Sequence, residues 1–216
     1  MLKQISSGTR AFCAIISLLC IAAIVLQLSM SLPGYADRER TLGGFLLEYF
    51  SYFTIQSNLL VALCTGCVAL SGFNGKWFTR AGVLSAVAVC ITIVSLVYNL
   101  VLRSTFHPVG WARVADELLH VVNPVLYLIF WAAISPKAGI TYRGTFSWLI
   151  YPLFYIIYIL VRGALTTKYP YFFLDAGKFG YPQVALNIAV LVVVFWLFCM
   201  LYAFIAQRIT GRKRQS

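Results

Sequence analysis

The stretch from Phe45 to Leu70 reads FLLEYFSYFTIQSNLLVALCTGCVAL, a long apolar segment with three polar side chains close together inside it. Thr54, Ser57 and Asn58 place two hydroxyls and an amide where a membrane helix normally has hydrocarbon. In an α-helix, positions i and i+4 share a face and position i+3 lies beside them. Because polar groups that face lipid are costly, we expect these three side chains to point into the protein.

The composition is that of a membrane protein. Hydrophobic residues make up 61% of the 216 residues, charged residues make up 11%, and the mean hydropathy is +0.86. A spanning helix needs about 20 mostly apolar residues. The sequence predicts an all-α polytopic membrane protein with six transmembrane helices in one bundle, a single domain over residues 1–216. The expected spans are residues 11–32, 45–70, 79–102, 112–134, 146–165 and 183–207.

The basic residues favour one side of the membrane. Six spans put both termini on the same side, which then holds ten of the 17 basic residues and none of the six acids. These ten are Lys3, Arg10, Lys76, Arg80, Lys137, Arg143, Arg208, Arg212, Lys213 and Arg214. The positive-inside rule therefore predicts cytoplasmic termini. Attraction to anionic lipid explains the net charge of +11 more simply than nucleic acid binding does.

The polar residues inside the spans gather toward the outer side. At 1.5 Å per residue, Thr54 is expected about 14 Å and His120 about 12 Å below the outer surface. Asp116, His120 and Asn123 follow i, i+4, i+7 spacing and share one helix face. Further polar residues lie near the outer ends of the third, fifth and sixth spans: Asn99, Arg103, Arg162 and Asn187. We expect an outward-opening pocket.

Each of these residues also has a structural interpretation. Hydroxyls and amides often form hydrogen bonds between membrane helices, worth about 0.6 kcal/mol on average, so any single one can serve packing alone. An ionisable group at depth indicates function by default, which singles out His120. His107 precedes Pro108 in a loop and is interpreted as a solvated histidine. Cys64 and Cys67 form a lone C-x-x-C, for which packing is favoured over metal binding, so we expect no metal site.

The residue types fit nucleophilic catalysis. A hydroxyl nucleophile needs a neighbouring base, and histidine is the usual one. Thr54 and His120 satisfy this requirement, with Asp116 or Asn123 as the group that orients the imidazole. Asn58 or Asn123 is a candidate donor to an oxyanion. No metal or organic cofactor is implied.

These residues resemble a known family, the androgen-induced type of integral-membrane threonine hydrolases together with their bacterial six-span relatives. The resemblance rests on the motif YFTIQSN at 52–58 and on His120 followed by Pro124. It extends to Tyr151-Pro152 and to the segment from Tyr169-Pro170-Tyr171-Phe172-Phe173 to Tyr181-Pro182, and covers roughly Tyr49 to Asn187. Loop lengths depart from those of the eukaryotic enzymes.

The resemblance implies a function and a location. Members of this family cleave fatty acid esters of hydroxy fatty acids with a threonine nucleophile and a histidine partner, which correspond here to Thr54 and His120. We therefore expect an esterase for lipid-like substrates in a bacterial plasma membrane, with Arg103, Arg162 or Lys168 available for an anionic substrate group. The alternatives are a non-catalytic lipid-binding or transport protein and a structural membrane partner. The sequence leaves the oligomeric state open.

The charge distribution predicts the topology directly. Reporter fusions placed after Ser216 and between Asp37 and Thr41 are expected to give cytoplasmic and external signals, respectively, because ten basic residues and no acid lie on the terminal side. An external signal at Ser216 would overturn the predicted orientation and the pocket opening derived from it.

Overall fold

The computed structural model describes residues 5–36 and 41–215, which are mostly helical and contain no strand. Six helices in this part of the chain are long and apolar enough to cross a membrane. They are Ser7–Ser31, Phe53–Ser71, Ala81–Leu102, Trp111–Ala133, Arg143–Thr166 and Ala176–Gly211. The protein is thus an all-α polytopic integral membrane protein, as the hydropathy predicts.

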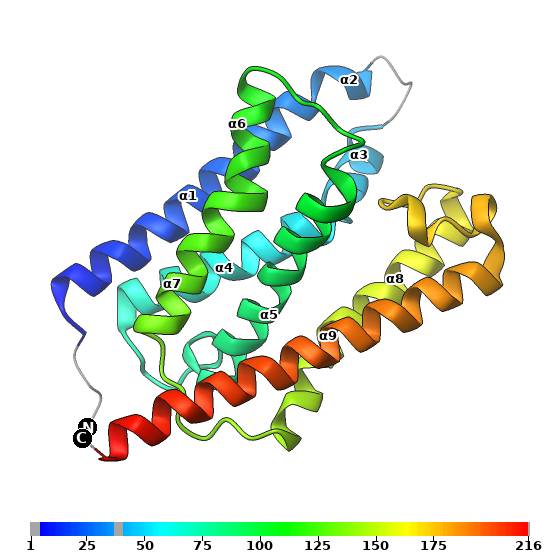
Figure 1. Cartoon of the computed structure of the whole chain (residues 1–216). Helices are drawn as coiled ribbons and strands as arrows, with labels where there is room; N and C mark the ends of the chain where they lie inside the picture. Colours follow the sequence, from blue (N-terminus) through cyan, green and yellow to red (C-terminus); the bar gives the residue numbers. More distant parts are fainter. Residues whose placement is uncertain (1–4, 37–40, 216) are drawn as a thin grey trace. The chain divides into compact units, whose positions relative to one another are not determined.

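The chain divides into two compact units, one up to Pro136 and one from Lys137 onward, and the expectation of a single bundle stays a prediction. The first unit contains α1 (Ser7–Ser31), α2 (Pro33–Ala36), α3 (Leu42–Tyr49), α4 (Phe53–Ser71), α5 (Ala81–Val97), α6 (Trp111–Glu117) and α7 (Asn123–Ala133) (Figure 1). Short turns join them: η1 (Trp77–Thr79) and the π-helical turns η2 (Tyr98–Leu102) and η3 (Leu118–Val122).

The second unit consists of η4 (Arg143–Leu149), α8 (Ile150–Thr166), η5 (Phe172–Leu174) and α9 (Ala176–Gln215). Near its start α9 is kinked at Gly180, whose φ of 73° and ψ of 156° are not helical. Glycine tolerates this positive φ, and Pro182 lacks the N–H that a continuous helix would use there. The apolar run expected from Gln183 therefore begins directly after the kink.

In the first unit, α1 packs against α4 and α6, while α5 packs against α4 and α7. Tyr127 and Phe130 of α7 are completely buried. At the start of α1, the Arg10 guanidinium donates to the carbonyls of Ala69 and Leu70, at 2.8 and 3.1 Å. The last carbonyls of a helix lack intrahelical donors, so Arg10 satisfies the end of α4. The beginning of α1 and the end of α4 thus lie at the same face of the unit.

The structure corrects the expected span 45–70, which is not one helix. Helix α3 ends at Tyr49 and α4 begins at Phe53, with Tyr52 in an extended conformation at φ −75° and ψ 125°. The Gln56 side chain donates to the Phe50 carbonyl at 2.8 Å and satisfies a group that the break exposes. Thr54 is therefore the second residue of α4, and the depth of about 14 Å calculated from a continuous rise does not apply to it.

A proline reshapes the helix that carries His120. In a regular α-helix the His120 carbonyl would accept from the N–H of residue 124, but Pro124 has none. The helix widens over η3, where the Asn123 N–H reaches back to Leu118 and not to Leu119. Side chains from neighbouring helices donate to the opened carbonyls. Ser95 donates to His120 at 2.8 Å, with Asn99 at 3.4 Å, and Asn58 donates to Leu119 at 3.1 Å.

Asn58 connects α4 to the wide turn and to the start of α7, and it also bonds back within α4. Its Nδ2 donates to the Thr54 carbonyl at 2.9 Å as well as to Leu119, and its Oδ1 accepts from Asn123 Nδ2 at 3.0 Å. Asn58 and Asn123 are both completely buried. An unpaired amide in this environment costs the full penalty of its lost hydration. The pair therefore fixes the register of α4 against η3.

The Asn58–Asn123 pair can be tested by a double-mutant cycle. Asn58→Leu is expected to lower the free energy of unfolding by about 1–3 kcal/mol, because it leaves the Leu119 carbonyl and Asn123 without their partner. Asn123→Leu should lower the free energy of unfolding less in the Asn58→Leu background than in the unmodified protein. The difference, the coupling energy, is expected to be at least about 1 kcal/mol. Reversible unfolding in mixed detergent micelles measures both values. Strictly additive losses would contradict the shared hydrogen bond.

Candidate active site

His120 lies in η3 with its imidazole mostly buried, the side chain being 12% exposed. Its Nδ1 is 2.9 Å from the backbone carbonyl oxygen of Asp116 and 3.1 Å from the carboxylate Oδ1 of the same residue. A backbone carbonyl can only accept a hydrogen bond, so Nδ1 carries the proton. When the ring is neutral, Nε2 therefore keeps its lone pair, and no hydrogen bond from a described residue reaches it.

Asp116 is held from a second side. Its Oδ2 accepts from the hydroxyl of Tyr98 at 2.5 Å, while its Oδ1 faces His120. The Tyr98 ring also stacks on the imidazole, with centroids 3.6 Å apart and planes inclined by 13°. Tyr98, Asp116 and His120 thus form one connected group at the contact between η2, α6 and η3. Of the two orienting residues considered from the sequence, Asp116 is the one in contact with the imidazole.

Thr54 and Ser57 occupy the first turns of α4. Thr54 is partly buried, and its hydroxyl has no hydrogen bond with the described residues. Ser57 is completely buried, and its Oγ likewise has no partner in the described part of the chain. Helix α4 packs against η3, but no hydrogen bond joins Thr54 to His120. The structure therefore brings the two helices together and leaves two hydroxyls uncommitted.

The amides of the first unit are largely occupied. Both N–H groups of Asn58 donate to backbone carbonyls, which leaves none for an oxyanion in this conformation. Asn99 likewise serves the backbone, donating to Ser95 at 2.8 Å. Asn123 Oδ1 is buried and has no partner among the described residues. The amide side chains of this unit therefore serve largely to pair backbone carbonyls at and beside the two π-helical turns.

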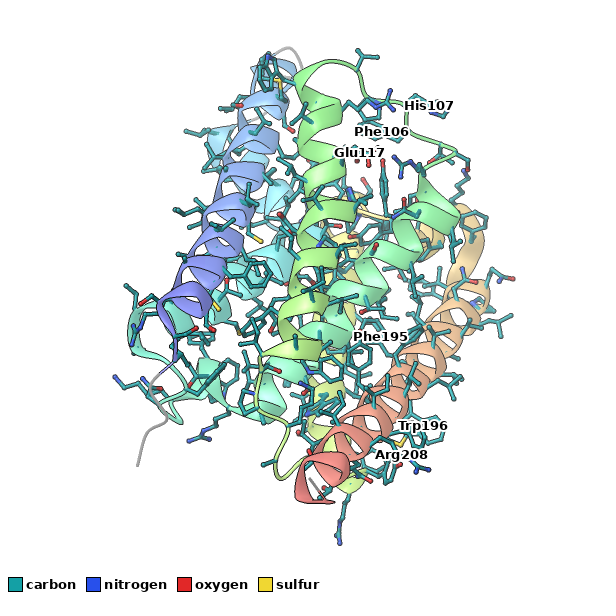
Figure 2. All side chains as sticks on the ribbon, turned by 60° about the vertical axis from the view of Figure 1, so that its left-hand side comes forward. Phe106, His107, Glu117, Phe195, Trp196 and Arg208 are labelled. Atoms are coloured by element: carbon teal, nitrogen blue, oxygen red, sulfur yellow. The ribbon has the colours of Figure 1, made fainter. Side chains whose placement is uncertain are left out.

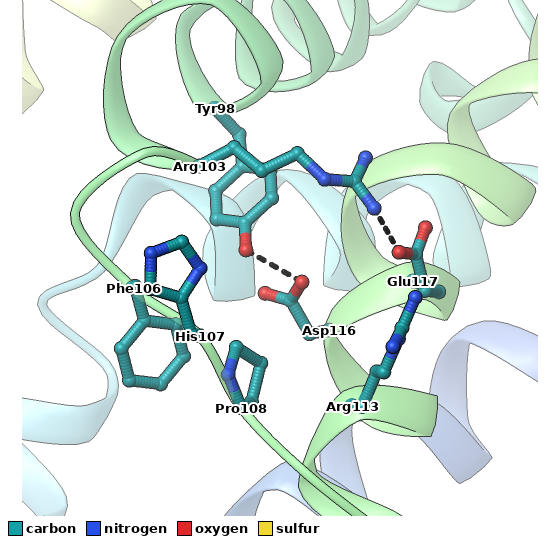
Figure 3. Close-up of a pocket in the computed structure, with 8 residues that line it drawn as sticks. All are labelled: Tyr98, Arg103, Phe106, His107, Pro108, Arg113, Asp116 and Glu117. Carbon is teal, nitrogen blue, oxygen red and sulfur yellow. Dashed lines mark hydrogen bonds and ion pairs between the residues drawn. The ribbon is translucent and has the colours of Figure 1, made fainter.

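A cavity of about 170 Å³ opens beside the group of Tyr98, Asp116 and His120. Its walls are Tyr98, Arg103, Phe106, His107, Pro108, Arg113, Asp116 and Glu117 (Figure 3). Arg103 is paired with Glu117 and also donates to Asn99 Oδ1 at 2.5 Å. Phe106, His107 and Glu117 lie at the end of the unit where the chain passes from α5 to α6 (Figure 2). Neither Thr54 nor His120 lines this cavity.

Arg162 and Asn187 belong to the second unit, where both contact the segment between α8 and α9. Arg162 is partly exposed and donates to the Lys168 carbonyl at 3.3 Å. Asn187 donates to the Phe173 carbonyl at 2.8 Å and accepts from Gln183 at 3.0 Å. These contacts give both side chains a local structural role, and their expected part in binding substrate stays a prediction.

Sequence reasoning missed Tyr98 and Ser95. Tyr98 looks like one of many aromatic residues in apolar spans, and Ser95 like an ordinary helix hydroxyl. A usable signal was present in Pro124, which removes the N–H donor four residues after His120 and so requires donors from a neighbouring helix. That requirement points to polar residues on the preceding span, where Ser95 and Asn99 are found.

The described residues contain no group of three or more His, Cys, Asp or Glu side chains arranged to hold a metal ion. No protein-family model, curated protein or solved structure is significantly similar to this chain. Function must therefore be argued from the geometry of the group formed by Tyr98, Asp116 and His120 and from the uncommitted hydroxyls of α4.

The contacts of His120 predict its tautomer. With histidine labelled by ¹⁵N and His107 replaced by Gln, a single imidazole remains, because the chain has two histidines. Its neutral form is expected to carry the proton on Nδ1 and the lone pair on Nε2, since both Nδ1 contacts are to Asp116 oxygens. Nitrogen chemical shifts distinguish the two tautomers. A predominant Nε2–H form would contradict this assignment.

Proposed function

We propose that the protein is a membrane-embedded hydrolase that cleaves fatty acyl esters, with Thr54 as nucleophile and His120 as general base. The observation that carries the proposal is the pairing of His120 Nδ1 with Asp116, which leaves Nε2 free to accept a proton. A carboxylate that fixes the tautomer of a histidine base is the arrangement found in hydrolytic triads. The resemblance of the YFTIQSN motif supports the same assignment.

The position of Thr54 supports its role. A residue in the first turn of a helix lies near unsatisfied N–H groups and the positive end of the helix dipole, both of which favour developing negative charge. The break before Phe53 gives Thr54 this position, which a continuous helix would not. Asn58 holds the same helix against η3, close to His120. The Thr54 hydroxyl has no competing hydrogen bond within the described residues.

The proposed reaction proceeds in two steps. The Thr54 oxygen attacks the ester carbonyl as Nε2 of His120 takes the hydroxyl proton, and that proton then passes to the departing alcohol. Water attacks the resulting acyl-threonine, again with His120 accepting a proton and then returning it to Thr54. The products are the fatty acid and the alcohol. The unpaired hydroxyl of Ser57 and the first amides of α4 are the proposed donors to the oxyanion, since Asn58 is occupied.

We also propose that the protein lies in a bacterial plasma membrane with both termini in the cytoplasm. The contact of Arg10 with the end of α4 supports placing the start of the first span and the end of the second on one side. The excess of basic residues on that side makes it the cytoplasmic one. The cavity beside Tyr98 then opens outward, since the loop that lines it follows the third span (Figure 1).

The dyad is tested by ester hydrolysis in purified protein. Thr54→Ala and His120→Gln are each expected to lower kcat by at least about 10³-fold, and the double variant should be little worse, because the two groups act as a unit. Thr65→Ala is the matched control. It removes a hydroxyl from the same helix that only bonds back within α4, to the carbonyls of Val61 and Ala62 at 2.8 and 3.4 Å, so it should retain full activity.

Thermal unfolding of the same samples separates loss of catalysis from loss of fold. Full specific activity in well-folded Thr54→Ala protein would refute the hydrolase proposal. If the unmodified protein binds lipid but hydrolyses no ester, the result would favour the lipid-binding alternative.

A further inference from the structure

We infer that Tyr98 is a positioning residue for His120, holding both the carboxylate that orients the imidazole and the plane of the ring itself. The inference rests on the proposed hydrolysis for its kinetic consequence. Its geometric basis is independent of that proposal, because the contacts of Tyr98 with Asp116 and His120 are present whatever the protein does.

The first contact fixes the carboxylate. Asp116 is 5% exposed and has two oxygens to satisfy. Oδ1 contacts Nδ1 of His120, and Oδ2 accepts a hydrogen bond from the Tyr98 hydroxyl at 2.5 Å. A carboxylate held at both oxygens cannot turn about its last bond without losing a hydrogen bond to a charged group, the stronger class of such bonds. Tyr98 therefore keeps Oδ1 directed at His120 Nδ1.

The second contact fixes the ring. With the centroids 3.6 Å apart and the planes nearly parallel, the Tyr98 ring covers one face of the imidazole. Rotation of the imidazole out of this plane would collide with the phenol ring. The stack and the Nδ1 contacts together restrict the direction in which Nε2 points, which is what a general base requires.

No other described side chain duplicates the hydroxyl contact. Arg103, which directly follows η2 and lines the same cavity, is already committed to Glu117 and Asn99. Tyr98 begins the π-helical turn η2, which places its side chain opposite Asp116 at the wall of the cavity (Figure 3). Phenylalanine at this position would keep the stacked ring and remove only the hydrogen bond.

The test uses variants that separate the two contacts. Tyr98→Phe removes the hydroxyl, and Tyr98→Leu removes the ring as well. Tyr127→Phe is the matched control, because it deletes another buried tyrosine hydroxyl in the same unit, one that bonds the Leu84 carbonyl at 3.1 Å and does not touch Asp116. All are compared in the His107→Gln background, where His120 gives the only imidazole signals.

Tyr98→Phe is expected to lower kcat by about ten- to a hundred-fold with little change in KM, because the hydroxyl orients the base and does not bind substrate. The ¹⁵N signals of His120 should shift from the single Nδ1–H form toward a mixture of tautomers. The upfield ring-current shift of the imidazole carbon-bound protons should persist in Tyr98→Phe and vanish in Tyr98→Leu. Tyr127→Phe should leave all of these values unchanged.

Unchanged kcat and unchanged His120 signals in Tyr98→Phe would overturn the inference even if the protein is a hydrolase. If the unmodified protein hydrolyses no ester, the proposed function fails, while the His120 signals still decide whether Tyr98 positions the ring. Asp116→Asn provides the second route where Tyr98→Phe does not fold. It should disturb the same His120 signals, and a parent-like spectrum in that variant would also overturn the inference.

Discussion

The missing N–H of Pro124 is the constraint on which the first unit depends. Inside a membrane no water is available to pair a freed carbonyl. A proline in a spanning helix therefore requires hydrogen-bond donors from side chains of neighbouring helices. Ser95 and Asn99 donate to the His120 carbonyl, and Asn58 donates to the Leu119 carbonyl. The same contacts tie α4, α5 and the helix of His120 together. Polar residues that are costly in lipid thus become the connections between helices.

The wide turn that results also sets the chemistry. It presents His120 to Asp116, whose carbonyl and carboxylate oxygens contact Nδ1, and to the Tyr98 ring, which stacks on a face of the imidazole. One nitrogen of the imidazole is committed and the other is left free. A mostly buried histidine held in this way has a defined tautomer and direction, which the proposed role as general base requires.

Helix α4 carries Thr54, the proposed nucleophile. Its break from α3 puts the hydroxyl of Thr54 in a first helical turn, and the Gln56 side chain satisfies the carbonyl left open by the break. The polar residues of the motif YFTIQSN therefore fall into two kinds. Gln56 and Asn58 stabilise the backbone, whereas the hydroxyls of Thr54 and Ser57 have no partner among the described residues. The two kinds of residue are interleaved along the same helix.

The sequence by itself determined the membrane class and the six spans, because burying apolar residues in lipid depends on average hydropathy over about 20 residues and not on any particular contact. It also placed Asp116 and His120 on one helix face, since their spacing matches the helical period. Only the tertiary structure decided the break at Phe50–Tyr52, which side chains pair the carbonyls opened by Pro124, and the role of Tyr98. Those features arise where one carbonyl must find a donor on another helix, and such a pairing depends on which helices are neighbours. A sequence window cannot contain that information, because Tyr98 and His120 lie on different helices and meet only after the helices have packed.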